Sequence, residues 1–403
     1  MKRSQYNIKI PTSSGSYVYN TVTGCFLPGD DAAGLSCAPF SVEDDCNEYS
    51  ELVSRNEELR RNSDFLVVTV QLTLSCNLRC VYCFQDRVVA DIPDAAIQSI
   101  LAWFRVSMSE RPWTRRLVVF WFGGEPTLRI EQMIAYSAAL RNVCQEYEVA
   151  YSSRLITNGY NLDAVLPFVE NLSLTDIQVT LDGSLAIHDA RRPRVDGMGS
   201  YRQILGGFER IHSTIDLVVR CNIDRSNFHD AALLLADIRS LRLDGSVRMF
   251  VQPMLVEDYG GESTCYVDRL DTLDRDTMNQ LLILEGECRS LEPPRFIGSV
   301  CNVDFPGSLV VDVNGNCGKC WAKAGLGGSD FVHDALDTAL RVTPRYEPRR
   351  SECRTCFAFP VCMGGCIFRP RDSAACRASR FRVFSTARYC IEKESAGAVN
   401  GVA

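Results

Sequence analysis

Three cysteines that could hold a metal stand close together, Cys76, Cys80 and Cys83, spaced C-x3-C-x2-C directly after a strand-like run at residues 65–74. Thiolates are soft ligands that suit iron–sulfur clusters or zinc. A [4Fe–4S] cluster normally takes four Cys ligands, so three cysteines on one loop leave one iron open to a substrate or cofactor. The spacing therefore favours a reactive cluster. A zinc site closed by a distant ligand, or three unrelated thiols, is the alternative.

A second candidate stretch follows some 40 residues later, where a β-rich run ends in Gly123, Gly124, Glu125 and Pro126. Paired glycines let a backbone approach a ligand closely, although alone they also suit a tight turn. Together with the cysteine loop, this stretch closely resembles the radical S-adenosylmethionine (SAM) superfamily. The resemblance implies that the three cysteines hold a [4Fe–4S] cluster whose open iron chelates SAM. It also implies that the Gly-Gly-Glu-Pro edge binds the SAM amino group and that Phe84 is a cofactor-binding residue.

The composition agrees with a metal-dependent enzyme. The chain has 403 residues, 46% hydrophobic and 23% charged, with a net charge of −7 that offers no general basic surface to nucleic acid. No apolar run reaches the roughly 18 residues that span a bilayer, and no signal peptide is evident, so we expect a cytoplasmic protein without membrane or nucleic-acid partners. Its 19 cysteines against 4 histidines favour thiolate ligation of metals over a disulfide framework.

Strands and helices must position these residues, and between residues 65 and 290 they alternate. We expect strands at 65–74, 117–122, 153–157, 177–181, 217–223 and 247–253. We expect helices at 94–108, 130–148, 162–170, 201–213, 228–241 and 275–290. Six βα units imply parallel strands with right-handed crossovers. Six units match the open (β/α)6 TIM-like partial barrel of the superfamily, an α/β fold whose sites gather at the C-terminal strand ends.

Two further strand ends extend the resemblance. Thr157-Asn158-Gly159 resembles a Thr-Asn-Gly element of the family, with Asn158 as a cofactor-binding residue. Thr180-Leu181-Asp182-Gly183, followed by a His-Asp-x-x-Arg segment ending at Arg192, resembles another. Carried over, Thr180 contacts the SAM ribose and Arg192 its carboxylate, for which a guanidinium is well shaped, and Asp182 belongs to the same site. The simpler interpretation is a turn at Asp182 and a solvated charge at Arg192.

The last third of the chain carries a second cysteine cluster. It contains Cys301, Cys317, Cys320, and then Cys353, Cys356, Cys362 and Cys366 in the run C-x2-C-x5-C-x3-C, followed by Cys376 and Cys390. This run resembles the SPASM domain of radical SAM enzymes, which holds two auxiliary [4Fe–4S] clusters. The resemblance assigns Cys301, Cys320 and Cys366 to the first cluster. It assigns Cys353, Cys356 and Cys362 to the second, closed by Cys390 more readily than by Cys376. Cys317 is either the fourth ligand of the first cluster or an extra thiol.

The chain divides into three predicted regions: an N-terminal region at 1–64, the radical SAM partial barrel at 65–290 and the SPASM domain at 291–403. In the first, residues 17–26 suggest a strand, turn and strand, 29–34 a loop, and 41–61 a helix capped by Ser41. This region is either a leader-peptide-binding element or a hairpin and helix that cover the barrel. The arginine-rich stretch 341–390 is either a basic docking surface or a set of counter-charges for the clusters.

The resemblance implies a one-electron reduction from a flavodoxin- or ferredoxin-type donor and hydrogen abstraction by a 5′-deoxyadenosyl radical, because the cofactor supplies the chemistry. We expect the substrate to be a ribosomally made precursor peptide and the favoured product to be a cyclophane C–C or thioether cross-link. Epimerisation and sulfatase-type formylglycine formation are the alternatives. Trp321 stands after Cys320, where the sulfatase maturases carry an Asp base. A non-enzymatic metal scaffold does not explain the recurring strand-end motifs.

Overall fold

The computed structural model describes residues 1–86, 88–211, 215–256, 292–298, 301–324, 351–366 and 373–400. These residues fall into two compact units. The larger, the sheet unit, contains the described parts of residues 63–270 and 305–343. The smaller, the N–C unit, contains residues 1–62 and the described parts of 271–304 and 344–403. The predicted helix at 275–290 lies outside the described residues.

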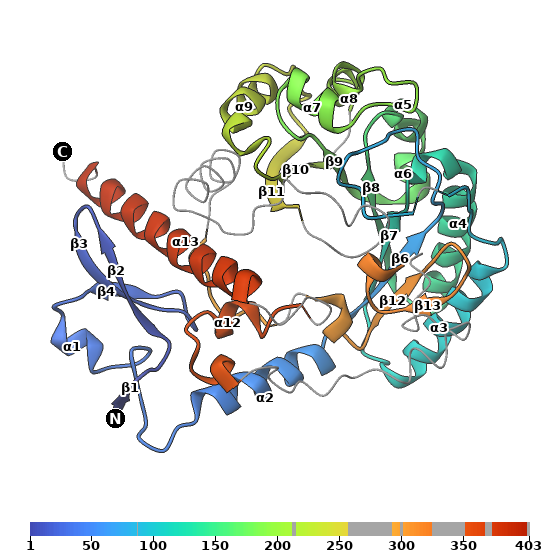
Figure 1. Cartoon of the computed structure of the whole chain (residues 1–403). Helices are drawn as coiled ribbons and strands as arrows, with labels where there is room; N and C mark the ends of the chain where they lie inside the picture. The colour runs from blue at the N-terminus through green and yellow to red at the C-terminus, as the bar shows by residue number, and fades with distance from the viewer. Residues whose placement is uncertain are drawn as a thin grey trace. The chain divides into compact units, whose positions relative to one another are not determined.

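The sheet unit is built on one sheet with the strand order β11-β10-β9-β8-β7-β6-β12-β13 (Figure 1). Its main strands are β6 (Phe65–Gln71), β7 (Arg116–Phe122), β8 (Ala150–Thr157), β9 (Leu174–Thr180), β10 (Asp216–Ile223) and β11 (Arg248–Leu255). Each pairs in parallel with the next along the chain. Sequential parallel strands joined by helical crossovers are the predicted partial barrel, which is confirmed. The near-continuous apolar runs fit strands that are covered on both faces.

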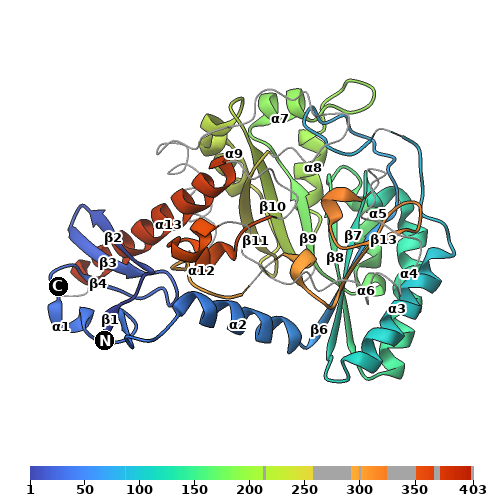
Figure 2. The ribbon, with the colours of Figure 1, turned by 60° about the horizontal axis from the view of Figure 1, so that its bottom comes forward.

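Helices form an arc along the outer side of these strands (Figures 1 and 2). They are α3 (Ala96–Glu110), α4 (Ile130–Glu146), α5 (Leu162–Val165), α6 (Val169–Leu172), α7 (Leu185–Arg191), α8 (Tyr201–Phe208) and α9 (Ala231–Arg239), with 3-10 turns η1 (Pro126–Arg129), η2 (Leu166–Phe168) and η3 (Phe228–Asp230). The single helix expected at 162–170 is interrupted by η2. The cause is Pro167, which lacks the N–H of an α-helical turn.

Two short strands extend the sheet beyond β6. Strand β12 (Ser308–Val311) pairs in parallel with β6, and β13 (Cys317–Gly318) pairs antiparallel with β12. The turn between them is held by the Asp312 carboxylate, which accepts hydrogen bonds from the backbone N–H groups of Asn314 at 2.8 Å and Asn316 at 2.9 Å. The 3-10 turn η5 (Trp321–Lys323) follows. A piece of the cysteine-rich region thereby becomes part of the main sheet, which the sequence did not predict.

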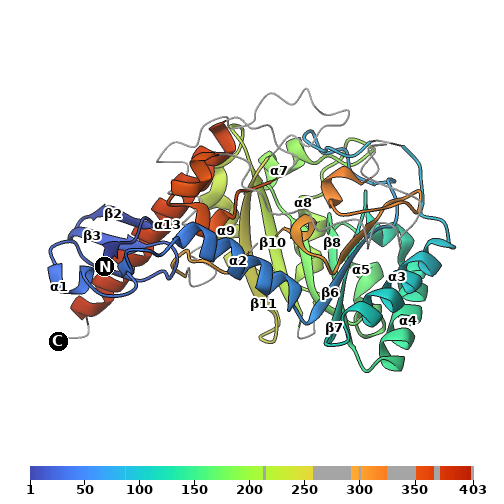
Figure 3. The same cartoon turned by 90° about the horizontal axis from the view of Figure 1, so that it is seen from below.

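The N–C unit contains an antiparallel sheet of β2 (Asn7–Thr12), β3 (Gly15–Asn20) and β4 (Phe26–Pro28), with a separate pair β1 (Lys2–Arg3) and β5 (Ser41–Val42). Its helices are α1 (Ala32–Leu35), α2 (Glu48–Arg61), α12 (Phe359–Cys362) and α13 (Ser373–Asn400), with η4 (Asn302–Asp304) and η6 (Ser351–Thr355). Helix α13 packs on β2 and β3 (Figure 3) through Ile10, Tyr19, Ala387 and Ile391. No helix in the described part of the chain is long and apolar enough to cross a membrane.

Two sequence predictions in this unit are wrong. Helix α2 begins at Glu48 rather than near Ser41, because Asn47 caps it by accepting a hydrogen bond from the Ser50 N–H at 3.2 Å. Ser41 instead lies in β5, and its hydroxyl donates to the carbonyl of Leu35 at 2.7 Å. Residues 29–34 were expected to form a loop, but α1 begins at Ala32 within this range, and the Asp31 side chain caps it.

Candidate active site

The three cysteines of the first motif lie around one cavity at the C-terminal end of β6. Cys76, Cys80 and Cys83 line a space of about 130 Å³, and Gly124 of the second motif lines the same space. The thiols are close enough that Cys76 and Cys83 both raise the pKa of Cys80. Three soft donors around one small cavity fit an iron–sulfur cluster, whose irons each take a separate thiolate. Within the described chain, no three Cys, His, Asp or Glu side chains converge on a point that suits a single metal ion.

Burial disfavours ionisation of these thiols unless a cation is bound nearby. Burial, and after it the nearby Glu125 carboxylate, raise the pKa of Cys76 to about 11. Burial raises the pKa of Cys80 to about 12, although the Arg192 guanidinium opposes the shift. Because a metal ligand must be a thiolate, iron binding has to release these protons. The site therefore suits a positively charged metal group, because that charge would stabilise the thiolate forms of these cysteines.

The Gly-Gly-Glu-Pro edge packs directly on the segment that leads into Cys76. The Gly124 N–H donates to the Thr73 carbonyl at 2.7 Å, and the Glu125 N–H donates to the Ser75 carbonyl at 2.9 Å. A Cβ on Gly123, whose φ is +150°, would lie 2.5 Å from the Thr73 carbonyl oxygen, and one on Gly124 would meet the Ser75 carbonyl at the same distance. Only glycine allows this approach, which brings the edge to the cluster cavity.

The Glu125 side chain points into the protein and joins the ends of β7 and β8. Its carboxylate accepts hydrogen bonds from the Thr127 N–H at 3.0 Å, the Thr157 hydroxyl at 2.7 Å and the Asn158 N–H at 2.7 Å. Burial raises its pKa, while these hydrogen bonds lower it. The adjacent Pro126 is buried at the start of η1. Glu125 thus fixes the position of the edge, while recognition of the SAM amino group by the edge stays a prediction.

Asn158 connects β8 to the cysteine loop. Its Nδ2 donates to Asn77 Oδ1 at 2.7 Å and lies 3.7 Å from Cys76 Sγ. Its Oδ1 accepts from the Tyr160 N–H at 2.9 Å, which fixes the amide orientation. The predicted cofactor-binding residue Asn158 therefore contacts both the predicted cluster ligand Cys76 and the loop that carries it.

A buried network links the cysteine loop to the ends of β9 and β10. The Tyr82 hydroxyl, between Cys80 and Cys83, donates a short hydrogen bond to Asp182 Oδ2. It accepts from Arg192 Nη1 at 2.7 Å and from Asn222 Nδ2 at 3.0 Å. The structure therefore brings together the predicted residues Asp182 and Arg192. Sequence reasoning missed Tyr82 and Asn222, although Tyr82 is an aromatic residue inside the motif and Asn222 is a polar residue near the end of an apolar strand.

The surroundings of this network hold it rigidly. Arg191 forms a buried ion pair with Asp224 at 2.6 Å, and its guanidinium lies 5.1 Å from the centre of the Tyr82 ring. His188 Nδ1 accepts from the Asp182 N–H at 3.3 Å, and its Nε2 lies 3.1 Å from Ser200 Oγ. Burial lowers the His188 pKa well below its usual value, and Arg192 and Arg191 lower it further. A neutral, fully hydrogen-bonded His188 is a scaffold residue. Thr180 is buried where β9 ends.

Trp321 reaches the cysteine loop from the segment after β13. Its ring contacts Phe84 edge-on, with centroids 5.9 Å apart, and contacts Phe122 at the end of β7 in the same manner at 5.7 Å. Phe84 is the predicted cofactor-binding residue beside Cys83. Phe84 follows Cys83 and Trp321 follows Cys320, so this aromatic contact links the cysteine loop to the segment that carries a cysteine predicted to bind an auxiliary cluster. This aromatic group, Phe84, Phe122 and Trp321, is absent from the sequence prediction.

The other predicted ligands divide between the two units. In the N–C unit, Cys366 lies close enough to Cys301 to raise its pKa, with burial as the larger cause. Cys353 and Cys356 pack against a core that contains Phe359. Cys362 ends α12, and Cys390 is buried on α13, where burial raises its pKa to about 11. Cys317 and Cys320 belong to the sheet unit. The Cys376 side chain lies outside the described residues, so the choice between Cys376 and Cys390 stays a prediction.

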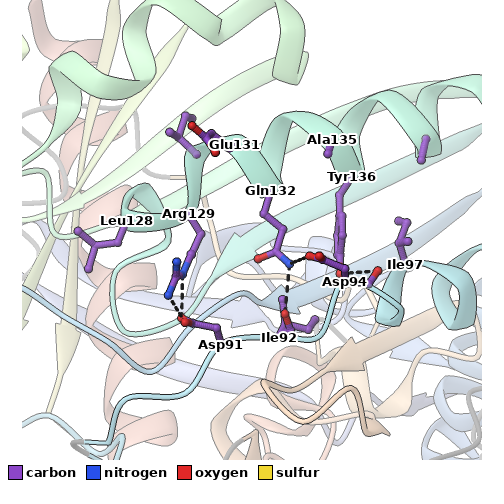
Figure 4. A pocket seen from close by; sticks show the side chains of 12 residues that line it. Asp91, Ile92, Asp94, Ile97, Leu128, Arg129, Glu131, Gln132, Ala135 and Tyr136 are labelled. Atoms are coloured by element: carbon purple, nitrogen blue, oxygen red, sulfur yellow. Dashed lines mark hydrogen bonds and ion pairs between the residues drawn. The ribbon is translucent and has the colours of Figure 1, made fainter.

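A larger groove of about 780 Å³ lies away from the cysteines, between the segment that leads into α3 and the start of α4 (Figure 4). Its polar side chains are bonded to one another. Arg129 pairs with Asp91, and Gln132 Nε2 donates to the Ile92 carbonyl at 3.1 Å and to Asp94 at 3.0 Å. The Asp91 carboxylate also accepts a hydrogen bond from the Thr73 hydroxyl at 2.6 Å. Asp91, which lines this groove, therefore supports the segment that leads into the cysteine loop.

Comparison with known proteins places this site in a family. Residues 70–232, which contain the cysteine loop and the strand ends described above, match the model of the Radical SAM superfamily. Over these residues the chain matches the radical SAM superfamily, as its strand-end motifs predicted.

Individual relatives are distant. Bovine Molybdenum cofactor biosynthesis protein 1 is 27% identical over 262 residues, which is 62% of this chain but only 38% of that protein. The Serine-type anaerobic sulfatase-maturating enzyme of Klebsiella aerogenes is 24% identical over 333 residues, 77% of this chain and 81% of that enzyme. Among solved structures, native anSMEcpe with bound AdoMet and Kp18Cys peptide matches with a TM-score of 0.55 and 16% identity, over 81% of this chain and 99% of that one. At that identity the match shows the shared fold, which extends beyond the barrel into the cysteine-rich region.

Proposed function

We propose that this protein is a peptide maturase of the radical SAM/SPASM type, which abstracts hydrogen from a ribosomally made precursor peptide and forms a side-chain cross-link. The observation that carries the proposal is the single cavity lined by Cys76, Cys80, Cys83 and Gly124. A reduced [4Fe–4S] cluster with SAM on its open iron supplies a 5′-deoxyadenosyl radical. The protein's part is to hold these groups, orient them and exclude water.

The residues take distinct roles in this proposal. Cys76, Cys80 and Cys83 bind the cluster. The backbone of the Gly123–Gly124 edge receives the SAM amino group at the mouth of the cavity. Arg192, whose Nε lies buried without a hydrogen-bond partner among the described residues, binds the SAM carboxylate, since a guanidinium offers a second donor to an anion. Thr180 and Asp182 hold the ribose side, while Tyr82 and Asn222 keep Arg192 and Asp182 in place.

The cysteine-rich region supports two auxiliary clusters in this proposal. Cys301, Cys317, Cys320 and Cys366 form the first ligand set. Cys353, Cys356, Cys362 and Cys390 form the second. Cross-linking removes two hydrogen atoms from the peptide. The 5′-deoxyadenosyl radical takes one, and the other leaves as a proton and an electron that an auxiliary cluster can accept.

One observation supports a peptide substrate, and a second distinguishes between the candidate reactions on it. The anSMEcpe structure that shares this fold was solved with a bound peptide. In addition, the position after Cys320 carries Trp321, packed between Phe84 and Phe122, where the sulfatase maturases carry an Asp base. A tryptophan has no proton-accepting group, so formylglycine formation lacks its base at this position. That reaction remains the second candidate because the Klebsiella aerogenes enzyme aligns along most of its length.

The first test is anaerobic reconstitution with iron and sulfide, followed by measurement of bound metal and of reductive SAM cleavage to 5′-deoxyadenosine. We expect iron with matching sulfide and clear cleavage in the wild type. The triple variant Cys76→Ala, Cys80→Ala, Cys83→Ala should lose cleavage while it keeps the iron of the auxiliary sites. Zinc without sulfide, or cleavage by the triple variant, would refute the site.

The second test concerns the substrate. A short peptide encoded beside this gene is co-expressed anaerobically with the enzyme, and its intact mass is measured. Loss of two hydrogen atoms per site, located by fragmentation, supports a cross-link. A formylglycine product on a Cys- or Ser-containing sulfatase peptide would instead establish the second candidate. An unchanged mass with a changed amino-acid stereochemistry would indicate epimerisation and would contradict the cross-link.

A further inference from the structure

Arg220 stands near the end of β10 and faces the inner side of the sheet, opposite the helices. On this strand Val219 and Cys221 are buried, whereas Arg220 between them is half-buried. Side chains alternate between the two faces of a strand, and the helices cover the outer face of the sheet (Figures 1 and 2). The buried neighbours therefore face the helices, and Arg220 faces the inner side.

The Arg220 guanidinium is held in place by the network around the cysteine loop. Its Nε donates to Asn222 Oδ1 at 2.9 Å, and Asn222 Nδ2 donates in turn to the Tyr82 hydroxyl at 3.0 Å. In the sheet register Arg220 lies beside Thr180 on β9 and beside Gln252 on β11. The guanidinium is therefore fixed through Nε next to a residue predicted to bind SAM, and its Nη1 and Nη2 remain to contact a ligand.

Arg220 differs from the other arginines on the strands of this sheet. Arg116, Arg154 and Arg248 each form an ion pair with a carboxylate, at N–O distances of 2.8 to 3.0 Å. By contrast, Arg220 Nη1 and Nη2 have no hydrogen-bond or ion-pair partner among the residues that the structure describes. A guanidinium that is partly removed from water without a counter-charge is costly, and its planar fork matches a carboxylate. We therefore expect an anionic ligand at Arg220.

The proposed function leaves this position to the substrate rather than to SAM. The single carboxylate of SAM is already assigned to Arg192, whose Nη1 donates to the Tyr82 hydroxyl at 2.7 Å. Tyr82 and Asn222 stand between Arg192 and Arg220 in the chain of hydrogen bonds. Asp182 is engaged within the same network, because it accepts from the Tyr82 hydroxyl and from the Asn222 N–H. The second guanidinium therefore needs a second anion.

We propose that Arg220 binds a carboxylate of the peptide substrate and thereby positions the residue that loses hydrogen. The inference rests on the proposed function and narrows its substrate class. The peptide carries a carboxylate close to the modified residue, either an Asp or Glu side chain or the C-terminus. Nη1 and Nη2 donate two parallel hydrogen bonds to this carboxylate, and the Gln252 amide offers a further donor beside them.

The first arm of the test changes the peptide and leaves the enzyme unaltered. The probe is the short peptide encoded beside this gene, labelled with a fluorophore, and its Kd is measured by anisotropy with full-length reconstituted enzyme and SAM but no reductant. A series of peptides replaces each Asp by Asn and each Glu by Gln, one at a time, and the C-terminal carboxylate by an amide. We expect one of these peptides to bind about 10- to 100-fold more weakly, because a hydrogen bond between charged groups is lost.

The second arm changes the enzyme. Arg220→Gln should weaken binding of the parent peptide by a similar factor. The peptide that lacks the decisive carboxylate should bind Arg220→Gln and the wild type alike, because the interaction is already absent. Arg220→Lys keeps the charge without the planar fork and should recover part of the affinity. The Kd for SAM, measured by calorimetry, should stay near the wild-type value in both variants.

The matched control is Arg248→Gln on β11. Its guanidinium lies on the neighbouring strand and is already paired with Asp216 at 2.8 Å. This control should leave the Kd values for the peptide and for SAM unchanged.

The outcomes separate this inference from the proposed function. Equal binding of every peptide in the series, with the parent peptide still modified by the wild type, would overturn the carboxylate subsite and leave the proposed function standing. A weaker Kd for SAM in Arg220→Gln, with peptide binding intact, would assign Arg220 to the cofactor and also overturn the inference. Absence of SAM cleavage by the wild type would refute the proposed function itself, and the inference with it.

Discussion

The Tyr82 hydroxyl accepts a hydrogen bond from Arg192 Nη1 at 2.7 Å, within the loop that also carries the three cysteines predicted to hold the radical cluster. The same hydroxyl donates to Asp182 and accepts from Asn222. One phenol therefore connects the cysteine loop to the ends of two strands. This arrangement means that the positions of the predicted cluster ligands and of the residues predicted to bind SAM are set together.

We expect Tyr82→Phe to weaken SAM binding without loss of the cluster. The change leaves the buried Arg192 and Asn222 donors and an Asp182 oxygen without their common partner. An unsatisfied buried polar group costs about 1–3 kcal/mol, which corresponds to a roughly 5- to 150-fold loss in affinity if the cost falls on the SAM-bound state. The measurement is the KM for SAM in reductive cleavage, together with the iron content.

The matched control for this variant is Tyr201→Phe. Tyr201 is also buried, and its hydroxyl also donates to a carboxylate, Asp237, at 2.7 Å, but it contacts neither the cysteine loop nor Arg192. We expect this control to change stability by a similar amount and to leave the KM for SAM unaltered. Equal KM values for the wild type and Tyr82→Phe would show that the phenol does not position the site.

Glu125→Gln should destabilise the connection between β7 and β8. The Glu125 carboxylate accepts from three donors, one of them the Asn158 N–H. A Gln can accept on one oxygen only, so its amide N–H₂ must face a backbone N–H. We expect a loss of about 1–3 kcal/mol in unfolding free energy, measured by anaerobic denaturation.

For Glu125→Gln the control is Glu131→Gln, which alters an exposed carboxylate at the start of α4. This control should lie within about 0.5 kcal/mol of the wild type, as surface changes usually do. A Glu125→Gln protein as stable as the control would mean that the edge does not depend on this carboxylate.

The sequence predicted the parts of the site that depend on local signals. Each main strand is an apolar run, and the chemistry-bearing residues follow directly where a run ends. Cys76 was found from the spacing of the cysteines, and Glu125, Asn158 and Asp182 from the resemblance of these strand ends to radical SAM motifs. Loops at the C-terminal ends of neighbouring parallel strands must then meet. This geometric rule predicts that the residues at these strand ends lie close together.

Contacts between distant segments could not be predicted in this way. Nothing near Trp321 in the sequence indicates that its ring contacts Phe84 and Phe122, because β12 first has to pair with β6.

The start of helix α2 at Glu48 was missed for a different reason. Ser41 and Asn47 are both good caps, and the pairing of β5 with β1 removes Ser41 from the choice.

Trp321→Ala should loosen the aromatic group beside the cysteine loop. Each edge-on aromatic pair contributes about 0.5–1.5 kcal/mol beyond buried area. We expect the alanine variant to form more 5′-deoxyadenosine per modified peptide, because a less enclosed site lets the radical be quenched by other hydrogen donors. Trp321→Phe, which keeps an aromatic ring, is the matched control and should stay near the wild-type ratio. An unchanged ratio in Trp321→Ala would place Trp321 outside the substrate site.

His188 should make the protein less stable in mild acid. Its pKa in the folded protein lies well below the usual value of about 6.5, first because it is buried and then because Arg192 and Arg191 stand nearby. Below about pH 6.5, His188 therefore binds a proton in the unfolded chain but stays neutral in the folded protein. The resulting stability is present above pH 6.5 and is lost as the pH falls from there toward the folded-state pKa.

His188→Gln tests this directly, because a Gln oxygen can accept from the Asp182 N–H and its amide can donate to Ser200. The unfolding free energy should be measured anaerobically for both proteins between pH 7.5 and about pH 5.5, a window that spans the unfolded-state pKa. We expect the wild type to lose more stability than His188→Gln across this window, since only the wild type has an imidazole to protonate. Parallel pH profiles would show that His188 is protonated equally in the folded and unfolded states, and would contradict its role as a neutral scaffold residue.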